Sequence, residues 1–382
     1  MKEPRNAVEL LQQLVQIPSV NPDLDPAAGG AGEAKCAEFV GELLKQWGAE
    51  VSFEEVEPGR PNVIGRFFAS GGASRRRVVF APHTDTVAVN GMSIDPFGGI
   101  ESNGRVYGRG ASDTKGTMAA MLWALKEVSS TVSSGEFPVE LVFVGLMGEE
   151  AGQPGSKHFA ERYHSGVEFA VVGEPTELKT VFAHKSCVWI ELSTQGRSCH
   201  GSTPEQGENA AEKMLKPLAD LLEYLRARLP SFENTVLGLP TVNLGRVRSG
   251  SSPNIVPSEC RATLDCRETP ELVSAGGAVG LIEAFLNENN LDLEVQHPPP
   301  STALLTDPAT DGVQRLLRIG SELTTAPWFC DAGWLGAAGI PAVACGPGSI
   351  AQAHTADEYL EIEDLIEGVD FYRRFMLSYQ EG

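Results

Sequence analysis

The chain has 382 residues, with 30 lysine and arginine residues against 51 aspartate and glutamate residues, which gives a formal net charge of -21 at pH 7. This length accommodates two domains of ordinary size, each with its own core. The acidic excess argues against a nucleic-acid partner, because such partners bind basic surfaces. No apolar stretch is long enough to cross a membrane, and the N-terminal residues lack the apolar centre of a signal peptide. We therefore expect a cytoplasmic protein that binds neither nucleic acid nor membrane.

The seven cysteines form an odd set without a Cys-x-x-Cys pair. This pattern indicates reduced thiols in the core, rather than a disulfide framework or a zinc knuckle. Cys199 stands beside His200 and remains a candidate for a reactive thiol.

The first part of the chain alternates between helical and strand-like patterns. We expect helices at 7–16, 32–47, 117–128 and 156–163, and strands at 50–53, 62–68, 77–81, 139–146 and 169–172. Strands that alternate with helices predict an α/β layer architecture with a mostly parallel central sheet.

The pattern changes near residue 182. We expect strands at 188–194, 241–247, 259–266 and 291–296, and helices at 209–229 and 270–289. This βαββαβ order is that of a ferredoxin-like α+β module, which we expect to be an inserted domain over residues 183–297.

The α/β pattern resumes after the run Pro298-Pro299-Pro300, with a helix at 311–323, an apolar run at 341–345 and a helix at 362–377. Residues 1–182 and 298–382 should therefore form one domain, and the prolines are a candidate for a stiff hinge.

Metal-type side chains follow several of the expected strands. His83 and Asp85 follow 77–81, the pair Glu149-Glu150 follows 139–146, and Glu174 follows 169–172. His354 follows the apolar run near the C-terminus, and Asp113 stands just before a helix. Sites in open α/β sheets form outside the carboxyl ends of the strands, so these residues are expected to converge. Two imidazoles and three carboxylates suit zinc or a similar divalent ion, and they exceed one tetrahedral site, which favours two metals that share a bridging carboxylate.

Each of these residues also has an ordinary structural interpretation. The adjacent glutamates suit a first helical turn, His83 and Asp85 suit a hydrogen-bonded core pair, and Asp113 suits a helix cap. Glu174 and His354 could be turn and surface residues. Gly108-x-Gly110 lacks the rest of a nucleotide fingerprint, and 196–200 lacks the order of a nucleophile elbow, so neither a nucleotide site nor a serine hydrolase is supported.

Together these motifs resemble the M20 metallopeptidase and deacylase family, the group of acetylornithine deacetylase, succinyl-diaminopimelate desuccinylase, aminoacylase and glutamate carboxypeptidase. The matching segments are 82–87, 108–116, 148–150, 173–176 and His354, in the order of the family and over nearly the whole chain. The resemblance implies a di-metal catalytic domain with an inserted lid and dimerisation domain.

The resemblance also implies roles for individual residues. His83 and Glu174 would hold one divalent metal ion, Glu150 and His354 the other, and Asp113 would bridge them. Asp85 would orient His83, and Glu149 would be the general base for a metal-bridged hydroxide that attacks an amide carbonyl. Zinc is the expected metal, with cobalt or manganese as alternatives.

In the family, a lid histidine from the partner subunit stabilises the oxyanion, and His200 matches that position. The resemblance therefore implies a homodimer through the lid domain, whereas the alternative for His200 is an exposed loop residue. Asn254 and Arg267 match lid residues that contact substrate, although Arg267 could instead form a structural salt bridge. Gly346, Gly348 and Ser349 are further candidates for substrate binding. Cys199 and Thr114 depart from the commoner residues of the family at their positions.

The segment 346–354, together with Asp357-Glu358-Tyr359, looks most like the acetylornithine deacetylase branch. We therefore expect a hydrolase of N-acyl amino acids in amino-acid biosynthesis, with N-acetylornithine as the first substrate and N-succinyl-diaminopimelate as the next. A dipeptidase or carboxypeptidase on the same scaffold is the nearest alternative, and an inactive binding homologue is a remote one. A two-metal phosphoesterase would need cations near the ligands, where the sequence offers only Arg109 and Lys115.

Overall fold

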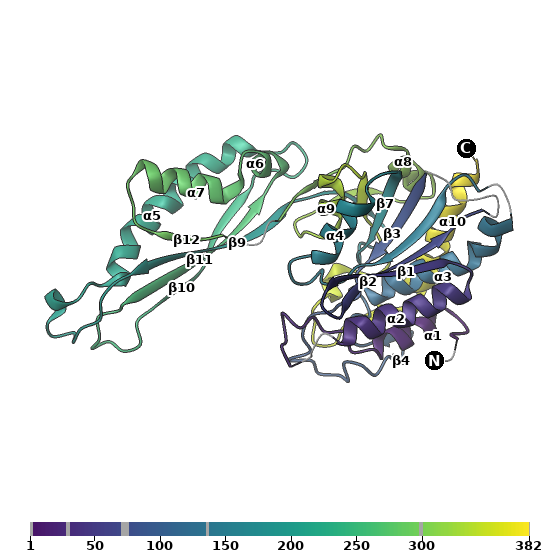
Figure 1. Cartoon of the computed structure of the whole chain (residues 1–382), viewed down its shortest axis with the longest axis horizontal. Coiled ribbons are helices and arrows are strands. Elements are labelled where there is room, and N and C mark those ends of the chain that lie inside the picture. The colour runs from purple at the N-terminus through teal and green to yellow at the C-terminus, as the bar shows by residue number, and fades with distance from the viewer. Residues whose placement is uncertain (1–2, 28–30, 70–75, 135–136, 298–300, 382) are drawn as a thin grey trace. The chain divides into compact units, whose positions relative to one another are not determined.

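The structure is a computed structural model that describes residues 3–27, 31–69, 76–134, 137–297 and 301–381. The chain divides into two compact units (Figure 1). Unit 1 comprises Met1–Phe182, Thr306–Thr324 and Cys330–Gly382, and unit 2 comprises Ala183–Leu305 and Thr325–Phe329. The run Pro298-Pro299-Pro300, expected as a hinge, lies outside the described residues.

The main sheet has nine strands in the order β1-β2-β6-β3-β7-β15-β8-β13, and β14 pairs with β8. The strands are β1 (Glu50–Glu57), β2 (Arg60–Phe67), β3 (Arg77–Pro82), β6 (Glu140–Gly145), β7 (Val167–Gly173), β8 (Thr180–His184), β13 (Leu304–Leu305), β14 (Leu323–Ala326) and β15 (Ala342–Ala344). A smaller sheet has the order β16-β5-β4, with β4 (Ile100–Ser102), β5 (Arg105–Tyr107) and β16 (Tyr359–Glu361).

The central sheet is mixed, so the expectation of a mostly parallel sheet was wrong. The strands β6, β3, β7 and β15 are parallel to their neighbours in this group, whereas β1, β2, β8 and β13 pair antiparallel. The turn between β1 and β2 consists of Pro58 and Gly59, with Gly59 at a φ of +72°. A turn this short can only make a hairpin, because a parallel pair needs a long crossover. The α/β class itself is confirmed.

The helices of unit 1 cover both faces of its sheet. They are α1 (Ala7–Val15), α2 (Ala31–Gln46), α3 (Lys115–Ser134), α4 (Pro154–Tyr163), α8 (Asp311–Arg318), α9 (Ala332–Ala337) and α10 (Ile362–Leu377). A Cβ on Gly65 of β2 would lie 2.8 Å from Leu44 Cδ1 of α2, so this helix sits close to the strand. Asn62 lies three positions earlier and therefore on the opposite face, where it donates to the carbonyl of Gly155 in α4 at 2.9 Å.

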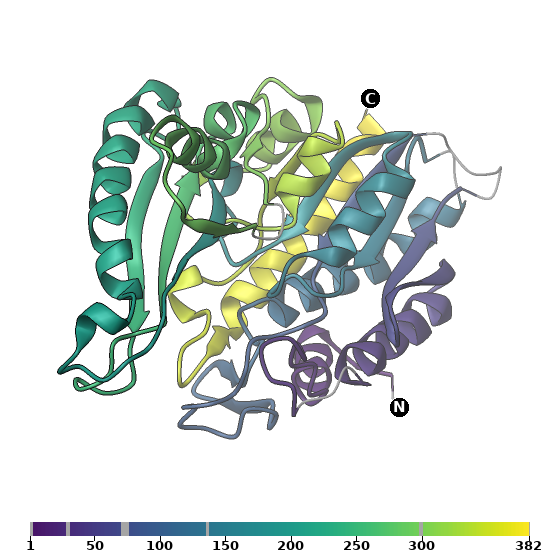
Figure 2. The same ribbon diagram turned by 60° about the vertical axis from the view of Figure 1, so that its left-hand side comes forward.

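Unit 2 has a four-stranded antiparallel sheet in the order β10-β11-β9-β12. Its elements are β9 (Ser186–Gln195), α5 (Ala210–Arg228), β10 (Thr241–Ser249), β11 (Glu259–Glu268), α6 (Pro270–Ser274), α7 (Gly277–Glu288) and β12 (Glu294–Gln296). Figure 2 shows α5 alongside this sheet. The single helix expected over 270–289 was wrong, because Gly276 and Gly277 adopt φ values of +99° and +71° and break it in two.

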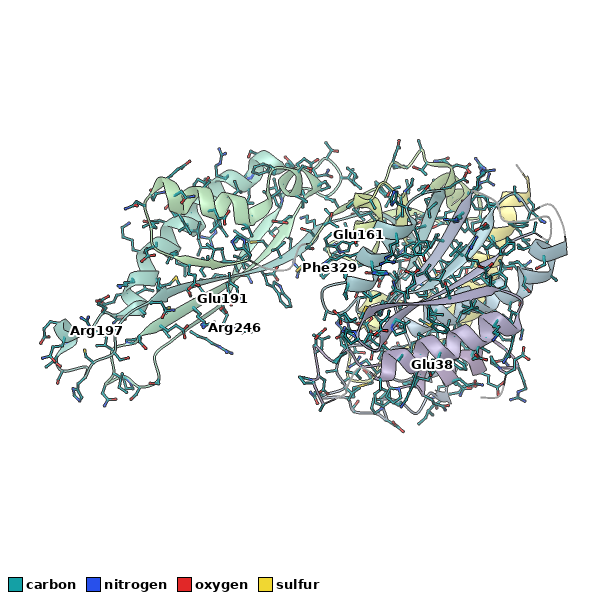
Figure 3. All side chains as sticks on the ribbon, in the orientation of Figure 1. Glu38, Glu161, Glu191, Arg197, Arg246 and Phe329 are labelled. Carbon is teal, nitrogen blue, oxygen red and sulfur yellow. The ribbon has the colours of Figure 1, made fainter. Side chains whose placement is uncertain are left out.

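Alternation along β9 separates a packed face from an open face of this sheet. Ile190 and Leu192 are buried in a core with residues of α5 and α7, whereas Trp189 is 68% exposed. Glu191 of β9 and Arg246 of β10, both labelled in Figure 3, share the open face, since each aligns with Thr263 of β11. The packing of two helices on one face gives unit 2 its own core.

Two general expectations can be compared with the whole described chain. All seven cysteines are free, and five of them are buried. Within the described part of the chain, none of the helices combines the length and apolar character that a bilayer crossing requires.

Candidate metal centre

The parallel strands of unit 1 bring the expected ligands to one edge of the sheet. His83 follows β3, Glu149 and Glu150 follow β6, and Glu174 follows β7. Because β3, β6 and β7 run in the same direction, their carboxyl ends share this edge. His354 comes from the segment that follows the parallel strand β15.

Asp113 lies between the two imidazoles. Its Oδ1 is 3.1 Å from His83 Nε2, and its Oδ2 is 3.3 Å from His354 Nε2. His354 Nε2 also lies 3.3 Å from Glu150 Oε2. Ligand atoms of His83, Asp113 and Glu150 lie within 4.8 Å of one another. A carboxylate that turns one oxygen to each imidazole has the arrangement of a bridging ligand.

Glu174 contributes a buried carboxylate with one oxygen that accepts no hydrogen bond from the described residues. The residue is 5% exposed, and among the described residues its Oε1 is buried without a hydrogen-bond partner. A buried carboxylate oxygen of this kind is costly unless a cation is bound to it.

The electrostatics of the cluster also favour added positive charge. Burial raises the pKa of Glu149, Glu150 and Glu174 above the ordinary range of glutamate, and the negative charge of Asp113 raises the pKa of Glu150 and Glu174 further. Hydrogen bonds to Asp113 and Glu150 raise the pKa of His354 to about 10. Carboxylates that repel one another in a buried site, together with imidazole nitrogens, form a donor set that fits divalent cations.

Asp85 lies next to the cluster and holds His83 and the backbone of the two glutamates in position. It lies 3.3 Å from His83 Nδ1 through Oδ1, and it accepts hydrogen bonds from the backbone amides of Glu149 at 3.0 Å and Glu150 at 3.1 Å. Asn21 donates to Asp85 Oδ2 at 2.8 Å. With Nδ1 of His83 engaged by Asp85, Nε2 faces Asp113 and is the available ligand atom.

The loop between β6 and α4 is held by two further side chains that the sequence analysis missed. Asn62 accepts from Met147 N at 3.0 Å, and Glu33 accepts from Gly148 N at 3.0 Å. Glu33 also pairs with Arg60, whose Nε lies 2.5 Å from Glu33 Oε2. Glu33 lies on the apolar face of the helix expected at 32–47, and an acid on such a face was the signal that could have found it.

Glu358, which the sequence indicated only as part of the segment typical of one family branch, fixes the backbone around Asp113. Its Oε1 accepts from the amides of Ser112 and Asp113 at 3.0 Å, and Arg109 donates to its Oε2 at 2.6 Å. Lys115 is fully buried and donates to the carbonyl of Ile17 at 2.7 Å. Arg109 and Lys115 are therefore occupied by contacts within the protein, and they are not available to bind the phosphate of a phosphoesterase substrate.

Three of the expected site residues lie in unit 2. His200 is exposed, with Nδ1 2.7 Å from Ser202 Oγ. Its backbone bridges to Ile255, beside Asn254, whose carbonyl accepts from Gly201 N at 2.7 Å. Arg267 donates from Nε to Asp265 Oδ1 at 2.8 Å, which is the salt bridge that the sequence analysis left open. The half-buried Cys199 donates to the carbonyl of Thr203 at 3.3 Å.

Gly346, Gly348 and Ser349 form hydrogen bonds with the loop after Glu174. The carbonyl of Gly346 accepts from Leu178 N at 2.9 Å, and that of Gly348 accepts from Glu177 N at 2.7 Å. Ser349 Oγ donates to Glu177 Oε1 at 3.2 Å. These contacts tie the loop that leads to His354 to the loop that follows Glu174.

The chain belongs to Peptidase family M20/M25/M40, whose family model matches residues 79–378. It is 28% identical to an acetylornithine deacetylase of Aliivibrio salmonicida (strain LFI1238) over 97% of this chain and 98% of that protein. It is 29% identical to an acetylornithine deacetylase of Vibrio campbellii (strain ATCC BAA-1116), again over 97% of this chain and 98% of that protein. These findings confirm the resemblance drawn from the motifs and make the chain a metal-dependent hydrolase of this family.

Solved structures share the fold. An M20 family metallo-carboxypeptidase from Sulfolobus solfataricus aligns over 100% of both chains with a TM-score of 0.79 and 20% identity. The aminopeptidase PepT from Bacillus cereus ATCC 10987 aligns over 98% of both chains with a TM-score of 0.72 and 20% identity.

Proposed function

We propose that the protein hydrolyses the amide bond of an N-acyl amino acid, with N-acetylornithine as the first expected substrate. The observation that carries this proposal is that the two adjacent glutamates at the sheet edge contact different partners. Asp113 faces both imidazoles, and Glu150 lies beside His354, whereas the neighbouring Glu149 has a different partner, Gln153. The names of the relatives, which match over nearly their full length, support an acylated ornithine as substrate.

We assign His83 and Glu174 to one divalent ion, Glu150 and His354 to a second, and Asp113 to both. The separate distances from the Asp113 oxygens to the two histidines support this pairing. Bound divalent ions would polarise the amide carbonyl and increase the acidity of water. Zinc is the expected ion, and cobalt and manganese also suit these ligands.

Glu149 is the proposed general base. Its carboxylate accepts a proton from the attacking water, and the resulting acid then donates that proton to the departing amine, which is otherwise a poor leaving group. Asp85 supports this role because it holds the amides of Glu149 and Glu150 at 3.0 and 3.1 Å, which fixes the direction of each side chain.

We propose that unit 2 serves as lid and dimerisation domain in a homodimer, and that His200 of one protomer completes the site of its partner. His200 Nδ1 interacts with Ser202, which leaves Nε2 free to donate to the oxyanion. Arg267 and Asn254 are the proposed substrate contacts. Arg267 uses Nε and one terminal nitrogen on Asp265, so its remaining N–H groups can reach a substrate carboxylate.

The test is a panel of N-acetylornithine, other N-acetyl amino acids, N-succinyl-diaminopimelate and dipeptides, each with zinc, cobalt or manganese added back to metal-free protein. The proposal expects the highest kcat/KM on an N-acetyl amino acid. A higher kcat/KM on dipeptides would replace it with a peptidase, and a preference for N-succinyl-diaminopimelate would replace it with a desuccinylase.

A further inference from the structure

We infer that Gln153, locked by Trp334, is a positioning residue that holds the carboxylate of Glu149 in place for proton transfer. This inference rests on the proposed function, in which Glu149 carries the proton. It concerns residues of unit 1 that lie outside the proposed ligand set.

A chain of two hydrogen bonds links the three side chains. Gln153 Nε2 donates to Glu149 Oε1 at 2.9 Å, and Trp334 Nε1 donates to Gln153 Oε1 at 2.9 Å. Gln153 is only 3% exposed and Glu149 only 9%, so water competes little for these contacts.

The chemistry of the three groups determines which group donates and which accepts in each of the two hydrogen bonds. The indole N–H of Trp334 can only donate, so the Gln153 amide must turn its oxygen toward the ring. Its NH₂ group is then left to face Glu149, where a donor to an ionised carboxylate makes a strong, directional bond. Without the indole N–H, the buried amide oxygen of Gln153 would lose its donor, and the side chain would hold its NH₂ group against Glu149 less firmly.

The backbone at Gln153 supports the same conclusion. Gln153 has φ 57° and ψ 41°, in the left-handed region, and it occupies the N-cap position of α4 without a side-chain cap hydrogen bond. Glycine or asparagine adopts this backbone more readily, and serine, aspartate or asparagine would cap the helix. Glutamine suits neither local requirement, but its length lets one side chain contact both Glu149 and Trp334.

Trp334 is itself held in position. It lies on α9, which packs against α4, and the ammonium of Lys157 on α4 lies 4.4 Å from the centre of its ring. Lys157 also donates to the carbonyl of Gly152 at 2.9 Å, next to Gln153. The indole therefore has two anchors on the segment that carries Gln153.

The experiment is a double-mutant cycle with Gln153→Asn, Trp334→Phe and the double variant. Asparagine keeps the amide and suits the left-handed backbone, but it is one carbon too short to span both partners. Phenylalanine keeps an aromatic ring and removes the N–H. Trp123→Phe is the matched control, because Trp123 Nε1 makes a comparable hydrogen bond to Glu127 at 3.1 Å on the protein surface.

The readouts are kcat, KM, bound metal and Tm, measured on the best substrate of the unmodified protein. Gln153→Asn should lower kcat by roughly 10- to 100-fold, as expected for the loss of a hydrogen bond to a charged group. Trp334→Phe should lower kcat by no more than this, because it acts through Gln153. Both variants should keep KM within about twofold and retain their metal content. The double variant should lose no more than the worse single variant, because Trp334 acts only through Gln153. Trp123→Phe should match the unmodified protein.

Unchanged kcat in Gln153→Asn and Trp334→Phe, losses that multiply in the double variant, or a loss that follows metal content or Tm would each overturn the inference. Glu149→Gln, assayed in parallel, separates this failure from that of the proposed function. An inactive Glu149→Gln beside fully active Gln153 and Trp334 variants removes only the positioning role. A fully active Glu149→Gln removes the proposed proton carrier itself.

Discussion

Replacement of Glu33 by alanine should destabilise unit 1 by about 4 kcal/mol, because two buried groups lose their partner at once. Arg60 is 5% exposed at its side chain, and among the described residues it keeps only Asp23 and Glu57 as ion-pair partners, which are 60% and 41% exposed and compensate its charge less well. Breaking a buried ion pair costs about 3–5 kcal/mol, and the lower end applies here because Arg60 keeps these neighbours. The orphaned amide of Gly148 adds about 1 kcal/mol.

Urea denaturation of Glu33→Ala, Arg60→Ala and the double variant measures this cost, with the exposed Glu38→Ala on the same helix (Figure 3) as control. The double variant should lose at least about 1 kcal/mol less stability than the two single variants lose in sum. The reason is that each single change leaves a buried charge without its partner, whereas the double change removes both charges. A loss below about 1 kcal/mol for Glu33→Ala, or strictly additive losses, would refute the assignment of Glu33 and Arg60 as a buried ion pair that anchors the loop between β6 and α4.

Further predictions concern the metal centre and the pH dependence of stability. Glu174→Ala should lower bound metal from two ions per chain to one by elemental analysis, as our pairing of ligands requires, and retention of both ions would contradict the pairing. A chelator should abolish hydrolysis, and zinc, cobalt or manganese should restore it; activity that persists in metal-free protein would contradict metal dependence. Burial lowers the pKa of His184 to about 4. Because the unfolded chain binds this proton first, the stabilising contribution is fully present above pH 6.5 and is lost as the pH falls toward 4, by up to about 3 kcal/mol. His184→Phe should flatten this part of the stability curve, and an unchanged pH dependence would refute the assignment.

The positions at strand ends could be predicted because β3, β6 and β7 are strongly apolar: β3 and β7 lead directly into His83 and Glu174, and a short loop joins β6 to Glu149 and Glu150. That adjacency is local in the sequence, and the parallel arrangement turns it into proximity in space. The antiparallel strands were harder to assign, since an apolar run does not specify the direction of its neighbour. The break between α6 and α7 was readable from Gly276-Gly277, because two adjacent glycines are poor helix formers.

The supporting side chains could not be predicted, since their partners are distant in sequence and carry no motif. Trp334 lies 181 positions from Gln153, and Glu358 lies 246 positions from Ser112. Only the folded chain brings such pairs together, and polar residues of these types are mostly exposed in general. The roles of His200 and Arg267 depend on contacts of unit 2 with substrate or a partner subunit, and they stay predictions.

The measurement that tests the central claim most directly compares Glu149→Ala with its neighbour Glu150→Ala, by kcat and bound metal. The two residues differ by one position in the chain, so they are matched controls for each other. We predict that Glu149→Ala keeps both ions and loses roughly 10²- to 10⁴-fold in kcat, whereas Glu150→Ala loses metal. Glu149→Ala with kcat close to that of the unmodified protein would contradict the assignment of Glu149 as the proton carrier.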